Sequence, residues 1–275
     1  MNLNICIVHY NSSDTLLCLQ SLAAQTVPVQ VVLVNNASTD HSMQAIRDYV
    51  AQSGMQVQLL EAPANNGFSA GNNIALRWAR QHTPEAWNLL LNNDTLLPAD
   101  FIEHLIAAAE AIRSTSAAPF ALSATEYDYA GRERRHSGMH YLSIPTGLSF
   151  TASGPLRTPY LCGACLLIDP QAPLWDEDYF LYYEDADYSQ RLRAAGYRLL
   201  TTDTTRYYHK VGGTTSRNAD IVAIQMTSMW RYYRTYYPRW ARLVKGVRQT
   251  ENLILGRRDI ARIIDQTYHE AHDKK

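Results

Sequence analysis

Residues 3–40, LNICIVHYNSSDTLLCLQSLAAQTVPVQVVLVNNASTD, contain the pattern that decides the fold. The runs LNICIV at 3–8 and VQVVLV at 29–34 are almost continuously apolar, as expected of strands buried on both faces of a parallel sheet. Between them, Ser13 or Asp14 can cap a helix that continues through LLCLQSLAAQ. The stretch therefore predicts a β-α-β unit.

The same alternation continues along the chain. Strands are expected near 56–61, 87–92 and 119–125, and helices near 41–52, 69–81 and 101–113. Strands that alternate with helices are typical of a parallel sheet with helices on its faces. We predict an α/β fold with a Rossmann-like, mostly parallel central sheet flanked by helices.

The composition is that of an ordinary globular chain. Its 275 residues suffice for one large domain or one domain with an appendage, and a formal net charge of -1 gives no reason to expect a nucleic acid partner. MNLNICIV has no basic region typical of a signal peptide, and no apolar run reaches the roughly 18 residues of a membrane span. Four scattered cysteines also suit a reducing compartment, so a cytoplasmic location is expected.

Cys162 and Cys165 form a C-x-x-C motif, which can mark half of a zinc site or a redox pair. They lie in TPYLCGACLLID, which reads as one buried strand. Residues three apart in a strand point to opposite faces, so the two thiols would diverge unless a bulge intervened. The sequence therefore favours a structural interpretation of both cysteines.

Polar residues follow the expected strands at their carboxyl ends. They form the clusters His9-Tyr10-Asn11, Asn35-Asn36, Asn65-Asn66-Gly67 and Asn92-Asn93-Asp94. Ligands of open α/β sheets bind outside these strand ends, although any one cluster could also be an ordinary cap or turn. The chain has no G-x-G-x-x-G and no P-loop motif, so Asp94 is a candidate to hold Mg²⁺ or Mn²⁺ against a diphosphate.

A second acidic cluster lies among aromatic residues in WDEDYFLYYEDADYSQRLRAAGYRLLTTDTTRYYH, residues 175–209. Glu184, Asp185 and Asp187 lie where aromatic neighbours can exclude water, and a partly desolvated carboxylate is suited to act as a general base. Asp185 could instead cap a helix that begins near Ala186. The two roles are compatible, because backbone donors would hold the carboxylate in place.

The end of the chain is basic and aromatic. The stretch KVGGTTSR at 210–217 resembles a loop that folds over phosphate, and two helices are expected from Asp220 onward. Basic residues predominate between Arg206 and Arg248, which suits a surface facing anionic lipid or a lipid diphosphate acceptor. The alternative is a solvated helical face whose aromatic residues pack on the core.

From residue 3 to about residue 240 the chain resembles glycosyltransferase family 2, whose members have the GT-A fold, and most of all its bacterial rhamnosyltransferase-like branch. The resemblance is carried, in order, by IVHYNSSDTLLCLQSL, VVLVNNASTD, NNGFSAGNN, LLLNNDTLLP, CGACLLIDP, WDEDYFLYYEDADYSQRLRAAGYRLL and YYHKVGG. It implies a GT-A domain over residues 1–217 and a C-terminal helical extension over residues 218–275 packed on it.

The resemblance also implies roles by position. The residues expected to bind the donor are His9, Tyr10, Asn11, Asn36, Asn66, Gly67, Asn73 and Asn93. Asn92-Asn93-Asp94 occupies the place of the family's D-x-D motif, so Asp94 is the expected metal ligand, with His209 able to approach the metal or the diphosphate.

Two asparagines replace acidic residues of the family. Asn92 lowers the charge of the metal site, and Asn36 replaces an aspartate but keeps an oxygen that can accept a hydrogen bond from a pyrimidine N3–H. The resemblance makes Asp185 the catalytic base and leaves Trp175 and Glu184 on the acceptor side.

The implied activity is an inverting, metal-assisted glycosyl transfer from a nucleotide-diphosphate sugar, with dTDP-L-rhamnose as a candidate donor. The acceptor would be a hydroxyl of a glycan or lipid-linked glycan in surface polysaccharide synthesis, with peripheral contact of the C-terminal helices at the inner face of the membrane.

A glycoside hydrolase is not favoured, because it would need two carboxylates flanking the bond and the sequence offers no clear second candidate. The alternatives are a sugar nucleotidyltransferase, whose glycine-rich opening loop is absent where HYNSSD stands, and a non-catalytic nucleotide-sugar-binding subunit. The sequence does not fix the oligomeric state.

Overall fold

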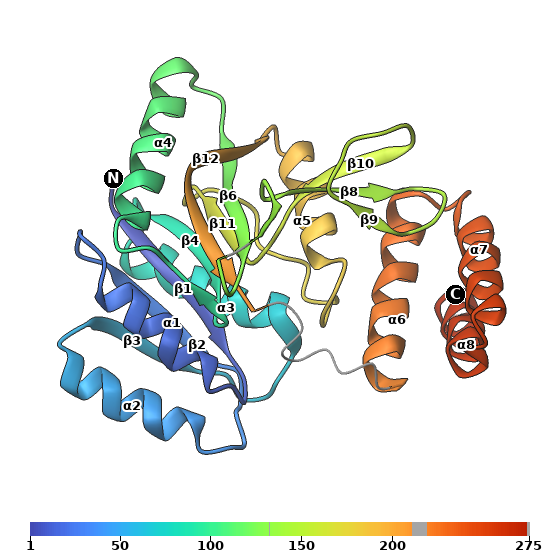
Figure 1. Cartoon of the computed structure of the whole chain (residues 1–275), viewed down its shortest axis with the longest axis horizontal. Helices are drawn as coiled ribbons and strands as arrows, with labels where there is room; N and C mark the ends of the chain where they lie inside the picture. Colours follow the sequence, from blue (N-terminus) through green and yellow to red (C-terminus); the bar gives the residue numbers. More distant parts are fainter. Residues whose placement is uncertain (132, 211–218, 274–275) are drawn as a thin grey trace.

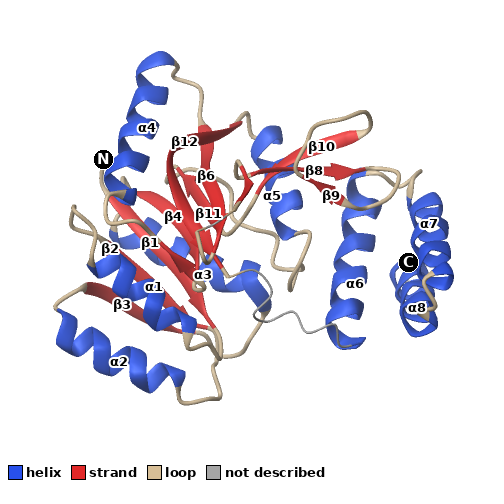
Figure 2. Cartoon of the chain, in the orientation of Figure 1, coloured by secondary structure: helices blue, strands red, loops and turns tan. Residues whose placement is uncertain are grey.

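The computed structural model describes residues 1–131, 133–210 and 219–273. Helices cover a central sheet, and a smaller sheet separates it from a group of C-terminal helices (Figure 1, Figure 2). The strands of the central sheet are β1 (Leu3–His9), β2 (Gln30–Asn35), β3 (Gln56–Glu61), β4 (Trp87–Asn92), β5 (Thr95–Leu96), β6 (Phe120–Asp128), β7 (Arg134–His136), β11 (Cys165–Ile168) and β12 (Arg198–His209). The helices around it are α1 (Asp14–Ala23), α2 (Ser42–Ser53), α3 (Gly67–His82), α4 (Phe101–Thr115) and α5 (Glu184–Ala194).

The first half of the central sheet is the predicted parallel sheet. Its strand order begins β3-β2-β1-β4, and all three pairs are parallel. The order continues β11-β6-β12-β5, in which β11 and β5 are antiparallel to their neighbours while β12 runs parallel to β6. The prediction of an α/β sheet flanked by helices is confirmed, and the antiparallel strands enter in its second half.

Two cores lie on the two faces of this sheet, because successive residues of each buried strand point to opposite sides. Ile5 and Ile7 pack with residues of α1, α2 and α4, such as Leu19. Cys6 packs on the other side with residues of α3 and α5, such as Leu76. Both faces are covered, which explains why the strands read as continuous apolar runs.

The smaller sheet corrects one prediction. It has the order β10-β8-β9, formed by β8 (Met139–Ser143), β9 (Ser149–Phe150) and β10 (Arg157–Leu161). The segment TPYLCGACLLID is therefore not one strand: Leu161 pairs with Met139 in the smaller sheet, and Cys165 pairs with Leu91 in the central sheet. The chain turns between them at Gly163 because the two halves belong to different sheets. The expectation that Cys162 and Cys165 share a strand was wrong.

The C-terminal region corrects a second prediction. It forms three helices in the described residues rather than two, namely α6 (Ala219–Tyr236), α7 (Ala241–Ile254) and α8 (Arg258–Asp273). The chain breaks between α7 and α8 at Gly256, which has a φ of 70°. Trp230, Val244 and Ile264 of these helices belong to a third core, which also includes Leu142 of β8 and Ala186 of α5. Within the described part of the chain, no helix is long and apolar enough to span a membrane.

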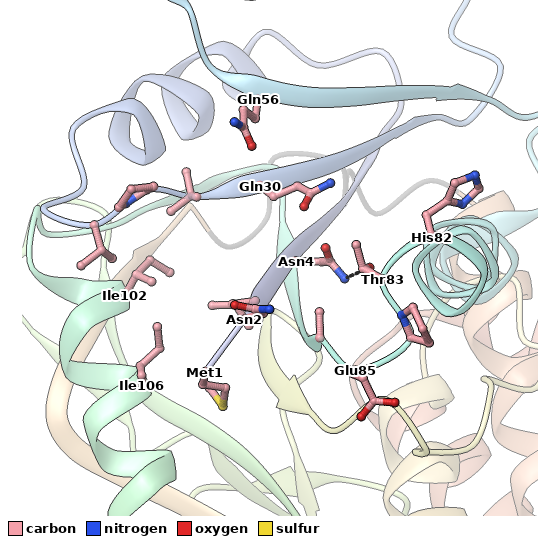
Figure 3. Close-up of a pocket in the computed structure, with 16 residues that line it drawn as sticks. Met1, Asn2, Asn4, Gln30, Gln56, His82, Thr83, Glu85, Ile102 and Ile106 are labelled. Carbon is pink, nitrogen blue, oxygen red and sulfur yellow. Dashed lines mark hydrogen bonds between the residues drawn. The ribbon is translucent and has the colours of Figure 1, made fainter.

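A cavity of about 640 Å³ lies at the amino-terminal edge of the parallel strands, where Asn4, Gln30 and Gln56 line it (Figure 3). These residues are at or near the first positions of β1, β2 and β3. Ligands of sheets of this kind bind at the opposite edge, beyond the carboxyl ends of the strands. The candidate site is therefore built from the loops of that other edge.

Candidate active site

The strand register brings the polar strand ends together. His9 of β1 pairs with Asn35 of β2, and Val8 pairs with Asn92 of β4. The backbone continues the contact beyond the strands, because Asn36 N–H donates to the His9 carbonyl over 2.8 Å. The clusters predicted from the sequence thus meet at one edge of the sheet.

Asn36 lies buried at this edge with one half of its amide unused. Its Nδ2 donates to Asn65 Oδ1 over 2.9 Å and to the Gly67 carbonyl over 3.2 Å. Its Oδ1 is buried and accepts no hydrogen bond from any described residue. A buried oxygen without a partner costs on the order of 1–3 kcal/mol, so it is suited to accept from a ligand N–H.

Asn66 and Gly67 bring the start of α3 against the loop that precedes α5. Gly67 has a φ of 90°, and a Cβ on it would lie 2.2 Å from the Phe180 carbonyl oxygen. Phe68 N–H also donates to that carbonyl over 2.8 Å. Only glycine permits this approach, which joins the donor-side loop to the segment carrying Asp185.

His9 lies beneath the donor loops rather than at their surface. It is fully buried, and its Nδ1 and Nε2 are hydrogen bonded to Thr15 Oγ1 at 2.7 Å and Ser42 Oγ at 2.9 Å. Asn93 Nδ2 donates to the same Thr15 hydroxyl over 2.8 Å. Burial lowers the pKa of His9, so the neutral imidazole is favoured. His9 thus ties the first turns of α1 and α2 to the end of β1 through both ring nitrogens.

Tyr10 and Asn11 form the outer rim of the same loop. Tyr10 is exposed, and Asn11 has a φ of 45°, a region that asparagine tolerates better than most residues. Asn11 Oδ1 accepts a hydrogen bond from the Thr39 N–H over 2.8 Å. This contact ties the loop after β1 to the loop after β2.

Asp94 and His209 face each other across the edge of the sheet. Asp94 Oδ1 lies 3.1 Å from His209 Nε2, and Asn92 Nδ2 lies 3.3 Å from the same nitrogen. The antiparallel pairing of β12 with β5 places Asp94 next to the end of β12. Two residues that are 115 positions apart in the sequence therefore form one centre.

Glu126 contacts Nδ1 of His209, the ring nitrogen that does not face Asp94. Its Oε2 lies 3.1 Å from His209 Nδ1, 3.2 Å from His136 Nε2 and 2.9 Å from Tyr207 Oη, which donates to it. Burial disfavours the charged ring of His209, but the hydrogen bonds to Asp94 and Glu126 outweigh it and raise its pKa to about 9. Burial also opposes ionisation of Glu126, yet the two histidines hold the pKa of Glu126 well below its ordinary value.

The residues around Asp94 fit a hard divalent cation. Asp94 and His209 offer a carboxylate oxygen and an imidazole nitrogen, and Asn92 Oδ1 is buried with no hydrogen-bond partner among the described residues. Such oxygen-rich sets suit Mg²⁺ and Mn²⁺. A binding cation would displace the proton from His209 Nε2.

A separate group of possible ligands is formed by His136, His140 and Cys162, whose ligand atoms lie within 4.8 Å of one another. His136 Nε2 and His140 Nε2 are 3.0 Å apart, and His136 also contacts Glu126. A thiolate and imidazoles are softer ligands than those that hold a diphosphate-bound Mg²⁺. The Asp94 centre is thus the better match to the predicted metal.

Asp185 lies in the first turn of α5, which begins at Glu184 rather than near Ala186 as predicted. Tyr183 occupies the N-cap position, so Asp185 is not the capping residue. Tyr182 and Tyr183 have φ values of 67° and 62°, an uncommon and strained region for bulky residues. This strained turn precedes Asp185, whose half-buried side chain lies in the site.

Burial raises the pKa of Asp185 to about 6. The backbone N–H groups of Ala186 and Gly163 have the opposite, smaller effect, because they favour the ionised form. The Ala186 N–H donates to Asp185 Oδ1 over 2.9 Å. Burial and the neighbouring Asp185 raise the pKa of Glu184 to about 8. At neutral pH the pair as a whole therefore carries one proton and one negative charge.

A cavity of about 240 Å³ opens in front of these acids. Its lining comes from the start of α5, from β8, β9 and β10 of the smaller sheet, and from α6 and α7. It includes Asp185, Glu184, Tyr160 and Arg248. Arg248 Nη1 pairs with Glu251 at 2.8 Å, while its buried Nε has no described partner. Sequence reasoning did not single out Arg248 as a site residue, because only packing brings α7 to α5.

Trp175 and Asn73 are buried, and Trp175 and Asp185 both lie close to Gly163. Trp175 stacks on Tyr188 with ring centroids 4.1 Å apart, and its backbone is held on both sides by the Asn73 amide. Asn73 Nδ2 donates to the Trp175 carbonyl over 3.0 Å, and Asn73 Oδ1 accepts from its N–H over 2.9 Å. Both residues thus fix the loop before Asp185.

The sheet and the polar residues at its strand ends have the arrangement expected of a GT-A fold. The chain belongs to glycosyltransferase family 2, because the model of that family, described as Glycosyl transferase family 2, matches residues 4–172. The protein is therefore a glycosyltransferase.

Two curated relatives are similar in sequence. The N-acetylglucosaminyl-diphospho-decaprenol L-rhamnosyltransferase of Mycobacterium tuberculosis is 26% identical over 253 residues, covering 81% of this chain and 80% of the relative. The low-salt glycan biosynthesis hexosyltransferase Agl10 of Haloferax volcanii is 22% identical over 207 residues, covering 70% of this chain and 62% of the relative.

Solved structures of glycosyltransferases share the fold. The mannosyltransferase PcManGT from Pyrobaculum calidifontis, in complex with GDP-Man and Mn²⁺, has a TM-score of 0.60 at 15% identity, covering all of this chain and 76% of that one. GalNAc-T7 with UDP, GalNAc and Mn²⁺ has a TM-score of 0.66 at 13% identity, covering 99% of this chain and 56% of that one. These likenesses establish the fold.

Proposed function

We propose that the protein is an inverting glycosyltransferase that moves a sugar from a nucleotide-diphosphate donor to a hydroxyl of a glycan or lipid-linked glycan. The observation that carries the proposal is the position of Asp185, half-buried at the head of α5 and facing a cavity. The similarity to a rhamnosyltransferase that acts on a lipid-linked diphosphate makes dTDP-L-rhamnose the first donor to test.

Asp185 would act as the general base. Its carboxylate accepts the proton of the acceptor hydroxyl while that oxygen forms a bond to the anomeric carbon. The bond from this carbon to the diphosphate breaks, and the diphosphate leaves with the electron pair. A pKa of about 6 keeps Asp185 ionised at neutral pH and still basic enough to take a proton in the transition state.

Asp94, His209 and Asn92 would hold Mg²⁺ or Mn²⁺. A divalent ion bound there neutralises charge that develops on the leaving diphosphate. Glu126 would orient His209 through its Nδ1, as a carboxylate does behind many metal-binding histidines. Mn²⁺ in the two solved neighbours supports the use of a divalent metal.

The donor would occupy the loops after β1, β2 and β4. Asn36 Oδ1 would accept from the N3–H of a pyrimidine base, because this oxygen is buried and unpaired. Tyr10 and Asn11 would contact the base and ribose from the rim. His9 and Asn93 would shape this pocket through their shared Thr15 hydroxyl.

Asn66, Gly67 and Asn73 complete the donor side of the proposal. Asn66 and Gly67 would present the start of α3 to the donor. Asn73 would act on the donor site indirectly, because its side-chain amide hydrogen bonds to the backbone of Trp175.

The acceptor would enter through the cavity in front of Asp185. Glu184 lines it and, when protonated, can donate a hydrogen bond to the acceptor sugar. Trp175 would shape the acceptor side from its buried position. We place the boundary of the catalytic domain at residue 217, so that the extension over 218–275 supplies Arg248 to the acceptor cavity. The reaction is proposed for the cytoplasmic face of the membrane, with peripheral contact through the C-terminal helices.

The test is a transfer assay with nucleotide-diphosphate sugars and a lipid-linked N-acetylglucosaminyl diphosphate, with and without Mn²⁺. We expect metal-stimulated transfer from one donor. Release of pyrophosphate from a nucleoside triphosphate and a sugar phosphate would instead identify a nucleotidyltransferase. Donor binding without any turnover would identify a binding subunit.

A further inference from the structure

The outer face of α7 is apolar. Leu243, Val247 and Ile254 are 50%, 36% and 79% exposed. Positions 243, 247, 250 and 254 follow at helical spacing, so these side chains lie on one face, with Thr250 between them. Leu253 and Leu255 at the end of the helix are exposed as well.

The inner face of the same helix carries polar side chains beside the buried Ala241 and Val244. Arg248 lines the acceptor cavity, Lys245 pairs with Asp265 of α8 at 2.6 Å, and Asn252 is buried. A surface helix of a globular protein normally presents polar and charged residues on its outer face. The apolar outer face of α7 therefore indicates that this face meets an apolar environment.

This clustering is particular to α7. The other large hydrophobic residues exposed in the described chain are scattered over the loops and helices at Tyr10, Leu17, Leu148, Leu156 and Phe180. Single exposed apolar residues are ordinary, whereas a contiguous patch marks an interaction surface. Figure 1 shows α7 and α8 as the outermost elements at the end of the molecule remote from α2.

Arginines border the apolar face. Arg242 precedes it, Arg257 and Arg258 follow it, and the exposed Arg262 lies one turn beyond Arg258 on α8. Within residues 1–131, 133–210 and 219–273, no ion pair or side-chain hydrogen bond engages these four guanidinium groups. A second copy docked face to face would bring like charges together, whereas an anionic bilayer would neutralise them.

We infer that the outer face of α7, with its bordering arginines, docks the protein on an anionic lipid bilayer. Leu243, Val247 and Ile254 enter the boundary between headgroups and acyl chains, and the arginines contact lipid phosphates. The helix lies in the plane of the interface and does not cross the membrane.

The docked orientation has a consequence for the acceptor, which rests on the proposed function. Val244 and Arg248 of α7 face the β8–β9 turn and the cavity of Asp185, and each lies about 100° around the helix from Leu243 or Val247 of the apolar face. In the docked orientation the cavity therefore lies within about one helix diameter, about 10 Å, of the bilayer. A lipid-linked diphosphate could reach Arg248 while its lipid stays in the membrane.

Flotation of the full chain with vesicles tests the docking without any substrate. Vesicles with roughly one third phosphatidylglycerol should carry the protein, and vesicles of phosphatidylcholine alone should not. The double variant Leu243→Ser/Ile254→Ser should reduce the bound fraction by about tenfold or more. The double variant Arg257→Gln/Arg258→Gln should bind less and lose its residual binding in about 1 M salt, where the screening length is about 3 Å.

The matched control is Leu17→Ser/Leu156→Ser, which removes two exposed leucines from other surfaces and should bind vesicles as the wild type does. Circular dichroism should show all variants folded, because every substituted side chain is exposed. The inference is overturned if the wild type ignores anionic vesicles or if Leu243→Ser/Ile254→Ser floats normally. It is also overturned if sedimentation shows a dimer that this variant dissociates while vesicle binding persists. Because no substrate is present, failure of the transfer assay would leave these readings unaffected.

Discussion

The two carboxylate centres of the site differ in their surroundings. Asp94 is paired with a histidine whose pKa is raised to about 9, and a buried glutamate supports that histidine. Asp185 lies beside a second acid, and no ion pair engages either of them in the described residues. The first environment favours charge and suits a cation, while the second disfavours charge and suits a base. The same residue type is thus adapted to opposite tasks by its neighbours.

The largest expected effect comes from removing the base. Asp185→Asn should lower transfer by about 10³-fold and leave donor affinity within about twofold, because the amide keeps the shape but cannot take a proton. Initial rates and donor titrations measure the two effects.

Asp187→Asn is the matched control, since Asp187 lies two residues along α5 and accepts a hydrogen bond from Tyr236 Oη over 2.8 Å. An asparagine oxygen can still accept that bond, so transfer should stay within about threefold. Equal losses in both variants would remove the distinction between the two aspartates.

The next effect concerns the cation centre. Asp94→Asn should lower transfer by about 10²-fold and abolish the thermal stabilisation that Mn²⁺ gives with a nucleoside diphosphate. Asp14→Asn removes another carboxylate from the same edge, one that pairs with Lys210 at 2.9 Å, and should keep the Mn²⁺ response. A normal response in Asp94→Asn would place the metal elsewhere.

A smaller effect is expected from pH. Since the pKa of Asp185 is raised to about 6, kcat/KM should fall by about tenfold per unit below that pH and level off above it. The direction follows because a base must be ionised, and a protonated Asp185 cannot accept the hydroxyl proton. A flat profile between about pH 5 and about pH 7, with the fold intact, would argue against this assignment.

The smallest effect is on stability. The pKa of Asp185 is higher in the folded chain than its ordinary 3.8, so the folded state binds more protons between these values, and stability is lost as pH rises through about 6. Asp185→Asn removes this loss and should raise the melting temperature by about 2–4 °C above pH 7, with no gain near pH 4.

Glu126→Gln provides the contrast, because Glu126 accepts hydrogen bonds from two histidines and a tyrosine. Its replacement should lower the melting temperature. Calorimetry at both pH values measures the two shifts. If the melting temperatures of Asp185→Asn and Glu126→Gln shifted in the same direction above pH 7, the two carboxylate centres would not differ as described.

Much of the fold could be predicted because its signals are local. The strands near 3–8, 29–34, 56–61 and 87–92 are present, since strands covered on both faces must be apolar throughout. The polar strand ends also meet, because parallel register carries them to one edge. The split between Cys162 and Cys165 escaped prediction because it depends on which sheet each half joins.

Parts of the site depend on distant packing. Glu126 was missed because the strand expected over 119–125 ended before it, although an acidic residue at the end of an apolar run was the available signal. Arg248 reaches the cavity only through the packing of α7 on α6 and α8. The third C-terminal helix was missed because Gly256 alone marks the break.

The anomeric configuration of the product tests the central claim most directly. If Asp185 activates the acceptor on the face opposite the leaving diphosphate, one displacement occurs, and nuclear magnetic resonance of the product should show inversion relative to the donor. Retention of configuration would contradict the account, because it requires a second displacement that a single base cannot provide.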